Sequence, residues 1–118
     1  MMNQVFLVGR ITKDPECDEK AEGKKLTHIT LAVQRPFKNV DGVYDTDFVR
    51  CVLWNAVAQS ATEYCKTGDV IGVKGRLETQ TYEDNEGKIK HFVQVVAERI
   101  SFIASKKSNI VQESKDNE

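Results

Sequence analysis

Apolar and polar residues alternate along much of this chain with a period of two, the pattern of β-strands whose two faces have different surroundings. The clearest case is the stretch from Asp47 to Trp54. Its two predicted faces carry Val49, Cys51 and Leu53 on one side and Phe48, Arg50, Val52 and Trp54 on the other. The second face sets two aromatic rings beside a guanidinium, which is unusual for a solvent-facing strand. Either the strand is buried on both faces, or this face is a surface on which flat rings stack next to phosphates; Val52 fits neither role clearly.

The same alternation predicts five strands and one helix. The strands are expected at residues 4–11, 26–38, 44–54, 69–82 and 88–103, and the helix from Ala56 to about Lys66 with Asn55 as its cap. Asp41-Gly42 predicts a hairpin turn, and residues 83–87 predict a second hairpin loop. Gly9 predicts a bulge or a close approach of two backbones, and the run 92–97 predicts either a bulge or burial of both faces.

This order of elements predicts an all-β domain over residues 1–104. Five antiparallel strands with a short helix between the third and the fourth are typical of a Greek-key barrel of the OB-fold type. The alternative is an α+β sheet with the helix packed on one face. Residues 12–25 are expected to form a solvated loop, and residues 105–118 a short disordered polar tail.

Composition narrows the class of protein. A chain of 118 residues with 40% hydrophobic and 30% charged residues is typical of one globular domain. No apolar run reaches the roughly 18 residues that span a membrane, and no signal peptide is recognisable, so a cytoplasmic location is expected. The net charge of −1 requires any nucleic-acid binding to rest on a local basic patch.

Motifs for catalysis and metal binding are absent from the sequence. The three cysteines Cys17, Cys51 and Cys65 are widely spaced and are expected to be reduced thiols, in a loop, in the core and on the helix. His28 and His91 lie in no zinc-ligand spacing, and no phosphate-binding glycine loop occurs. We therefore expect no enzyme activity, no metal and no cofactor.

The feature that does indicate a function is that aromatic side chains recur next to basic ones. Stacking is worth about 1–3 kcal/mol per base and tolerates every base, while cations neutralise phosphates. This pattern predicts sequence-independent binding of a single strand, because the bases of a duplex are already stacked. The candidate site residues are Phe37, Phe48, Trp54, Tyr82, Arg35, Lys38, Arg50, Lys74 and Arg76.

Most of these residues also have a purely structural interpretation. Trp54 could lie beneath the helix that follows it, and Phe48 could pack in a subunit interface. Phe37 has the parity of the core residues before it, so it reaches the outside only if the preceding proline bends the strand. Lys74 and Arg76 could be ordinary solvated charges.

Several segments resemble bacterial single-stranded DNA-binding proteins. They are residues 3–16, 30–33, 47–54, 64–68 and 75–79, and the resemblance runs from about residue 2 to residue 104. It implies an OB-fold that assembles as a homotetramer and binds single-stranded DNA during replication, recombination and repair, near the nucleoid. The aromatic residues that stack bases in the family fall on the four aromatics named above, and its basic contacts fall on the five basic residues.

Two features depart from the family pattern. Members usually continue into a flexible linker with an acidic tip that recruits replication and repair proteins. This sequence instead ends in Asp116-Asn117-Glu118. Such an ending is expected of a trimmed form or of a short paralogue, including one from a mobile element. Glu78 and three acidic residues between 83 and 86 are expected to weaken or reshape DNA binding. The alternative function is a dimeric OB-fold accessory protein of the primosome type, whose aromatic face binds another protein; a nucleoside deaminase is a third class.

Overall fold

The computed structural model describes residues 1–19 and 21–106. Its elements are β1 (Val5–Ile11), β2 (Asp18–Glu19), the 3-10 turn η1 (Ala21–Gly23), β3 (Lys25–Lys38), β4 (Tyr44–Trp54), α1 (Asn55–Tyr64), β5 (Val70–Glu83) and β6 (Ile89–Ala104). The five predicted strands are confirmed within two residues at each end. The structure adds one short strand that was not predicted. The loop expected between the first two long strands contains β2, which pairs with β3, and η1.

The five long strands close into a barrel. Around the ring, β1 pairs with β5, β5 with β6, β6 with β4, β4 with β3, and β3 again with β1. The predicted five-stranded OB-fold barrel is therefore confirmed, and the alternative of an open sheet with a helix on one face is wrong. The expectation of purely antiparallel pairing is also wrong, because Cys51, Val52 and Leu53 of β4 run parallel to Val95, Val96 and Ala97 of β6.

Inward-facing side chains from every wall of the barrel form the core. Ile11, Leu31, Leu53, Ile71 and Val95 are its largest fully buried apolar members. Burial of such side chains contributes about 1.5–3 kcal/mol each to folding. The predicted inner face of β4 is confirmed, since Cys51 and Leu53 are fully buried in the core cluster and Val49 packs against it.

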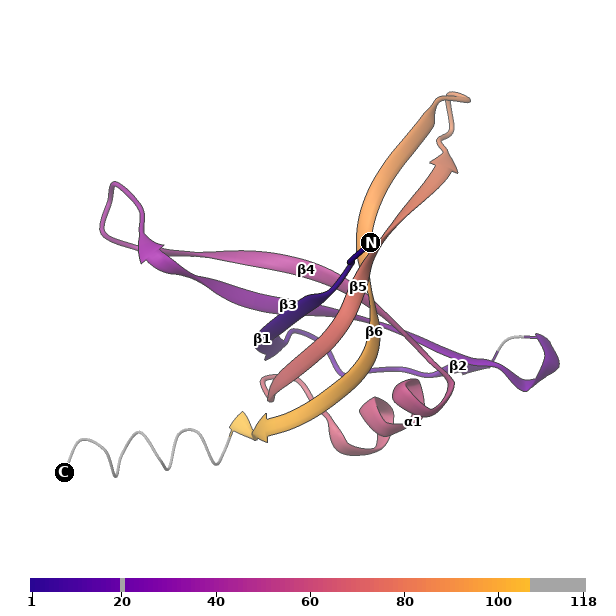
Figure 1. Cartoon of the computed structure of the whole chain (residues 1–118), viewed down its shortest axis with the longest axis horizontal. Helices are drawn as coiled ribbons and strands as arrows, with labels where there is room; N and C mark the ends of the chain where they lie inside the picture. The colour runs from indigo at the N-terminus through magenta and orange to yellow at the C-terminus, as the bar shows by residue number, and fades with distance from the viewer. Residues whose placement is uncertain (20, 107–118) are drawn as a thin grey trace.

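Helix α1 lies across one end of the barrel and inserts Ala58 and Ala61 into the core (Figure 1). The predicted capping by Asn55 is wrong: the helix has no side-chain cap, and the Asn55 amide oxygen instead accepts a hydrogen bond from the Lys25 backbone N–H at 3.2 Å. The helix also ends at Tyr64, so Cys65 lies just beyond it, although it is buried in the same core. Cys17 lies in a loop and Cys51 in the core, as predicted.

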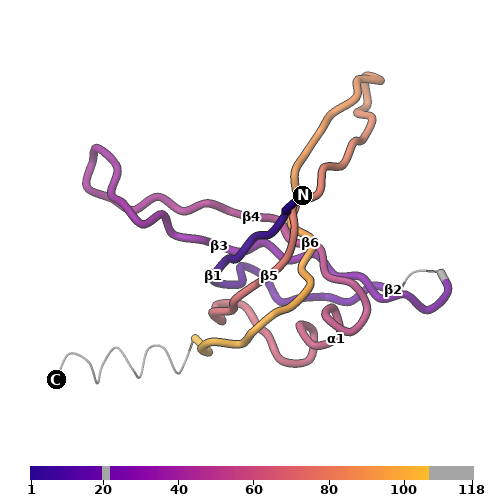
Figure 2. The backbone as a smooth tube through the Cα atoms, viewed as in Figure 1, coloured from indigo at the N-terminus to yellow at the C-terminus, as the bar shows by residue number. Residues whose placement is uncertain are grey.

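Two long hairpins extend from the barrel as separate arms, one formed by β3 and β4 and the other by β5 and β6 (Figures 1 and 2). The first turns at Gly42, as predicted, where the Gly42 N–H donates to the Asn39 carbonyl oxygen at 3.0 Å and φ is 78°. The second turns at residues 84–87. The arms matter for function because they carry part of the predicted binding surface away from the barrel.

The strand β6 resolves the ambiguity of the run 92–97. Its pairing with β5 is regular there, and Gln94 and Val95, which face opposite sides, are both buried. Burial of both faces is therefore confirmed at Gln94 and Val95 but not at Val93, which is 59% exposed. The shift in register falls just after the run, where Gly75 pairs with Ala97 and Lys74 with Arg99. The close approach predicted at Gly9 is confirmed, since a Cβ there would lie 2.7 Å from the Ala32 carbonyl oxygen.

Strand β6 ends at Ala104, and the domain boundary predicted at residue 104 stays a prediction. Most of the predicted tail, residues 107–118, lies outside the described residues. No helix in the described ranges is long and apolar enough to cross a membrane.

Candidate nucleic-acid interface

The outward side chains of β4, β6 and β5 form one continuous surface, which we call the outer face. Strand register defines its rows: Val52 of β4 lies beside Val96 of β6, which lies beside Arg76 of β5. Two residues further along, Gln94 of β6 lies opposite Glu78 of β5. The outer face comprises Phe48, Arg50, Val52 and Trp54 on β4, Lys90, Phe92, Gln94 and Val96 on β6, and Arg76, Glu78, Gln80 and Tyr82 on β5.

Phe92 is the residue at which the aromatic and cationic side chains of the outer face meet. The Tyr82 ring lies 6.0 Å from it, centre to centre, with 54° between the planes. The Arg50 guanidinium carbon lies 5.6 Å from the centre of the same ring, within cation–π range. The structure thus joins β4, β6 and β5 through one ring, which offers a flat platform with a positive charge beside it.

Phe92 is not among the site residues predicted from the sequence. Its position in an apolar run hid its parity, because Val93 and Val95 on the inner face and Val96 on the outer face are all apolar. Pairing with β5 assigns Phe92 to the side of Gln94 and Lys90. The two polar neighbours two residues away on either side were the signal that could have revealed this.

All four predicted aromatics are exposed, so none of them is a core residue. The exposed fractions are 61% for Phe37, 69% for Phe48, 40% for Trp54 and 52% for Tyr82. The bend required for Phe37 is present, since the register between β3 and β4 shifts between Gln34 and Lys38, around the proline. Phe37 belongs to β3 and Tyr82 to β5, so they lie on different hairpins, whereas Phe48 and Trp54 are the first and last outer-face residues of β4.

Val52, unassigned from sequence, lies on the outer side of β4 between Arg50 and Trp54. It is buried there, outside the main core cluster, with Val96 of β6 and His28 of β3 as its lateral neighbours. It therefore supports the middle of the outer face rather than the barrel interior.

The predicted basic residues differ in how free their charges are. Arg35 donates to both carboxylate oxygens of Asp47, at 2.8–3.1 Å, and lies 3.9 Å from Asp45. This pairing lowers the pKa of the Asp47 carboxyl and raises that of the Arg35 guanidinium.

Lys38 places its ammonium nitrogen 5.7 Å from the centre of the Tyr44 ring. Within the described part of the chain, no carboxylate lies within ion-pair distance of Arg50.

Arg76 is paired with an acidic neighbour on its own strand. Its guanidinium lies 3.4 Å from the Glu78 carboxylate, which also accepts hydrogen bonds from the side-chain amides of Gln80 and Gln94. The amide hydrogen bonds, with Arg76 contributing, lower the pKa of the Glu78 carboxyl, so it carries a full negative charge at neutral pH.

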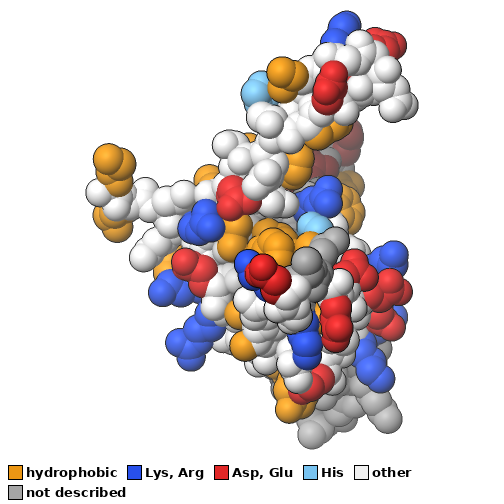
Figure 3. Space-filling view, turned by 90° about the vertical axis from the view of Figure 1, so that its right-hand side faces the viewer, with side chains coloured by type: hydrophobic (Ala, Val, Ile, Leu, Met, Phe, Trp, Pro, Cys, Tyr) orange, Lys and Arg blue, Asp and Glu red, His pale blue; other side chains and the backbone are white. Residues whose placement is uncertain are grey.

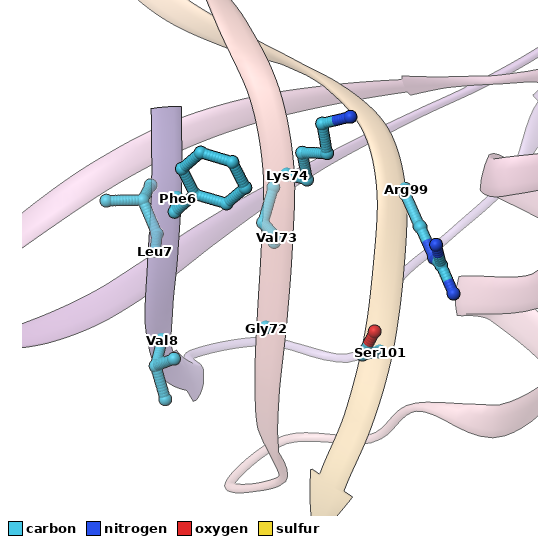
Figure 4. A pocket seen from close by; sticks show the side chains of 8 residues that line it. All are labelled: Phe6, Leu7, Val8, Gly72, Val73, Lys74, Arg99 and Ser101. Carbon is cyan, nitrogen blue, oxygen red and sulfur yellow. The ribbon is translucent and has the colours of Figure 1, made fainter. Parts of the chain in front are cut away.

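Lys74 is placed with different neighbours from those of Arg76. It lies between Phe6 of β1 and Arg99 of β6 in strand register, and these three residues line a shallow pocket of about 340 Å³. Figure 4 shows the Phe6 ring extending from β1 toward β5, where Lys74 projects from the strand. Lys74 therefore borders an apolar surface on β1 rather than the aromatic cluster of the outer face.

Charges of both signs are interspersed over the face of the molecule that Figure 3 shows. In Figure 3, Lys and Arg side chains alternate with Asp and Glu over the visible face, and hydrophobic side chains are scattered along the arms. This distribution matches the net charge of −1. Attraction to nucleic acid must therefore come from individual basic residues placed beside aromatic rings.

The buried cysteines, Cys51 and Cys65, are not activated for redox chemistry. Burial raises the pKa of the Cys51 thiol to about 11 and also raises that of Cys65, which lies near Asp69, so neither is a reactive thiolate at neutral pH. Among residues 1–19 and 21–106, no group of three or more His, Cys, Asp or Glu could hold a metal ion.

Comparison with known proteins adds independent information about the whole barrel. The model of the "Single-strand binding protein family" matches residues 2–103. The chain is 44% identical over 108 residues to single-stranded DNA-binding protein 3 of Listeria innocua, covering 92% of this chain and 68% of the relative. It is 42% identical over 106 residues to single-stranded DNA-binding protein B of Bacillus subtilis, covering 90% and 94%. A single-stranded DNA-binding protein of Bacillus cereus is 43% identical over 103 residues, covering 87% and 61%.

Proposed function

The chain belongs to the single-strand binding protein family, and on this basis we propose that it binds single-stranded DNA without sequence preference through its outer face. The observation that carries the proposal is the cluster of Tyr82, Phe92 and Arg50, flanked by the exposed ring of Phe48. Aromatic rings stack any base, and an adjacent guanidinium neutralises phosphate. The activity is binding and protection of the strand in replication, recombination and repair, with no chemical step.

In this proposal the two arms extend the binding path. Phe37, Arg35 and Lys38 contribute from the β3–β4 arm and Tyr82 from the β5–β6 arm, while Phe48, Arg50 and Trp54 bind along β4. Arg76 contacts phosphate from the outer face, and Lys74 does so from the part of β5 that lies beside β1. Arg35 and Arg76 bind phosphate only after exchanging their carboxylate partners, so we expect Arg50 to be the strongest basic contact.

We further propose that the protein acts as a homotetramer in the cytoplasm, on DNA of the nucleoid. The support is an exposed apolar group on β1 and β6, formed by Phe6, Val8 and Ile103. Val8 pairs with Gly72, and a Cβ added to this glycine would lie 3.6 Å from the Ile103 Cδ1 atom. Val8 and Ile103 therefore lie on either side of one small residue. Such exposed apolar groups are typical of subunit contacts.

Fluorescence titration tests the binding proposal directly. Trp54 is the only tryptophan of the sequence and lies on the outer face, so oligo(dT) should quench its emission. The affinity should fall linearly with the logarithm of salt concentration, and duplex DNA should compete poorly. Anisotropy of an end-labelled oligonucleotide measures the same binding without relying on Trp54. A folded sample that binds oligo(dT) in neither assay would contradict the proposal.

A further inference from the structure

Glu78 occupies an unexpected place for an acidic residue, in the middle of the outer face. It lies on β5 between Arg76 and Gln80 and opposite Gln94 of β6. Phe92 is the outward residue of β6 that comes two positions before Gln94. The carboxylate is therefore surrounded by the side chains that we propose to contact DNA, rather than lying at their edge.

Both oxygens of this carboxylate are already bound. Oε2 lies 3.4 Å from the Arg76 guanidinium, and Oε1 accepts hydrogen bonds from the Gln94 amide, at 3.1 Å, and from the Gln80 amide. The Glu78 side chain is 28% exposed and that of Arg76 is 43% exposed. A guanidinium and two amides that converge on one anion form the kind of donor set that also binds phosphate.

Resting on the function proposed above, we propose that Glu78 is an internal competitor of DNA phosphate. In the free protein it holds Arg76, Gln80 and Gln94 in place, and a phosphate that approaches Arg76 must displace this carboxylate and remain near its negative charge. Glu78 thereby sets the affinity and the salt dependence of binding without contacting DNA favourably. In the free protein the carboxylate also has a structural role, because Gln94 is buried and its side-chain amide would otherwise lack this hydrogen-bond acceptor.

The test compares wild-type protein with Glu78→Gln, in anisotropy titrations with labelled oligo(dT) at several salt concentrations. Glutamine keeps an acceptor oxygen for Gln94 but removes the charge that holds Arg76. We expect binding about two- to tenfold tighter at low salt. Because Arg76 then becomes available for one more phosphate contact, the slope of log affinity against log salt should be steeper by about 0.7.

Glu63→Gln is the matched control. Glu63 lies on α1, outside the outer face, and its carboxylate also accepts a hydrogen bond from a glutamine amide, that of Gln59 at 3.0 Å. The two substitutions change the net charge equally, so a general charge effect would appear in both. The inference expects the steeper salt slope only for Glu78→Gln.

Arg76→Ala, made in both backgrounds, separates competition from a purely structural role. If Glu78 occupies Arg76, removing Arg76 should weaken binding at least about twofold more in the Glu78→Gln background than in wild type. Equal effects in both backgrounds, or unchanged affinity and slope for Glu78→Gln, would overturn the inference while leaving the binding function intact. Failure of wild type and every variant to bind oligo(dT) would overturn the proposed function and this inference together.

Discussion

Phe92 connects three strands at the level of single side chains. It contacts Tyr82 across the β5–β6 pairing and supports the Arg50 guanidinium from β4. A half-buried ring of this kind has little freedom to reorient, since its neighbours fix it from two sides. We infer that it offers a preorganised stacking platform, whereas the more exposed Phe48 must be ordered when DNA binds.

Replacing Phe92 by leucine should weaken binding of oligo(dT) by about 1–3 kcal/mol, because the apolar volume is largely kept while the stacking ring and the cation–π contact are lost. Anisotropy titration measures the change, and circular dichroism checks that the fold is retained. Tyr64→Leu on α1 is the control, since it removes an aromatic ring that lies away from the outer face. Equal affinities for Phe92→Leu and wild type would show that this ring does not stack a base.

At the level of elements, the bend of the β5–β6 hairpin separates the barrel from its arm. The register shift pairs Lys74 with Arg99 but Gly75 with Ala97, so Glu98 is the extra residue of a β-bulge. Gly75 makes this possible, because a Cβ there would lie 2.1 Å from the Val96 carbonyl oxygen. The sequence alternation alone did not distinguish this glycine from its neighbour Gly72.

Gly75→Ala should therefore destabilise the protein by more than about 2 kcal/mol, since backbone atoms of β6 must move to admit one methyl group. Urea unfolding monitored by circular dichroism measures the loss. Gly72→Ala is the matched control on the same strand, because its Cβ would meet the Ile103 side chain at 3.6 Å, an ordinary contact. A comparable cost for both substitutions would contradict this account of the bulge.

A second element-level feature is the contact between the loop after β1 and the loop between α1 and β5. The Asp14 carboxylate accepts hydrogen bonds at 2.7 Å from both the backbone N–H and the hydroxyl of Thr67. These bonds lower the pKa of Asp14 below its ordinary value of 3.8. Folding is therefore stabilised by this group above that pH, and the contribution disappears as the pH falls through the lowered folded-state pKa.

Asp14→Asn should lower the melting temperature at pH 7, and the difference from wild type should shrink as the pH falls through the lowered folded-state pKa and the wild-type carboxylate becomes protonated. Thermal unfolding at several pH values measures both effects. Asp41→Asn at the tip of the β3–β4 arm removes a carboxylate without breaking this loop contact and serves as the control. A difference that persists unchanged at low pH would show that charge at Asp14 is not what stabilises the contact.

At the scale of the whole molecule, two surfaces divide the barrel. The outer face of β4, β6 and β5 carries the aromatic and basic cluster, whereas β1 presents Phe6 and Val8 to solvent beside the pocket that Lys74 and Arg99 border (Figure 4). Assigning DNA to the first surface and subunit contacts to the second lets both functions operate at once. Each surface can then be tested by a substitution that leaves the other unchanged.

Light scattering after gel filtration should give a mass near four times 13.3 kDa for the wild-type protein. Phe6→Ser should shift the mass to smaller species, because it removes the largest exposed apolar side chain of the proposed contact. Phe48→Ser removes a similarly exposed ring from the outer face and should leave the mass unchanged. A monomeric wild type, or a smaller mass only for Phe48→Ser, would contradict the assignment of these surfaces.

The sequence by itself determined the barrel and most of the aromatic surface. Alternation fixes which side chains of a strand face inward, as for Cys51 and Leu53, because the period of two is a property of the extended backbone. Turn signals such as Asp41-Gly42 fix where hairpins reverse, because few residues adopt the required positive φ. These are local constraints, and local constraints can be read along the chain.

Tertiary structure decided what depends on residues far apart in sequence. The parallel pairing of β4 with β6 brought Phe92 beside Arg50, and the pairing of β5 with β6 brought Gln94 to Glu78. The side chain of Asn55 bonded Lys25 instead of capping its own helix, because folding brought that backbone N–H within reach. Which charges are free and which are already paired follows from such contacts, so only the fold distinguished Arg50 from Arg35 and Arg76.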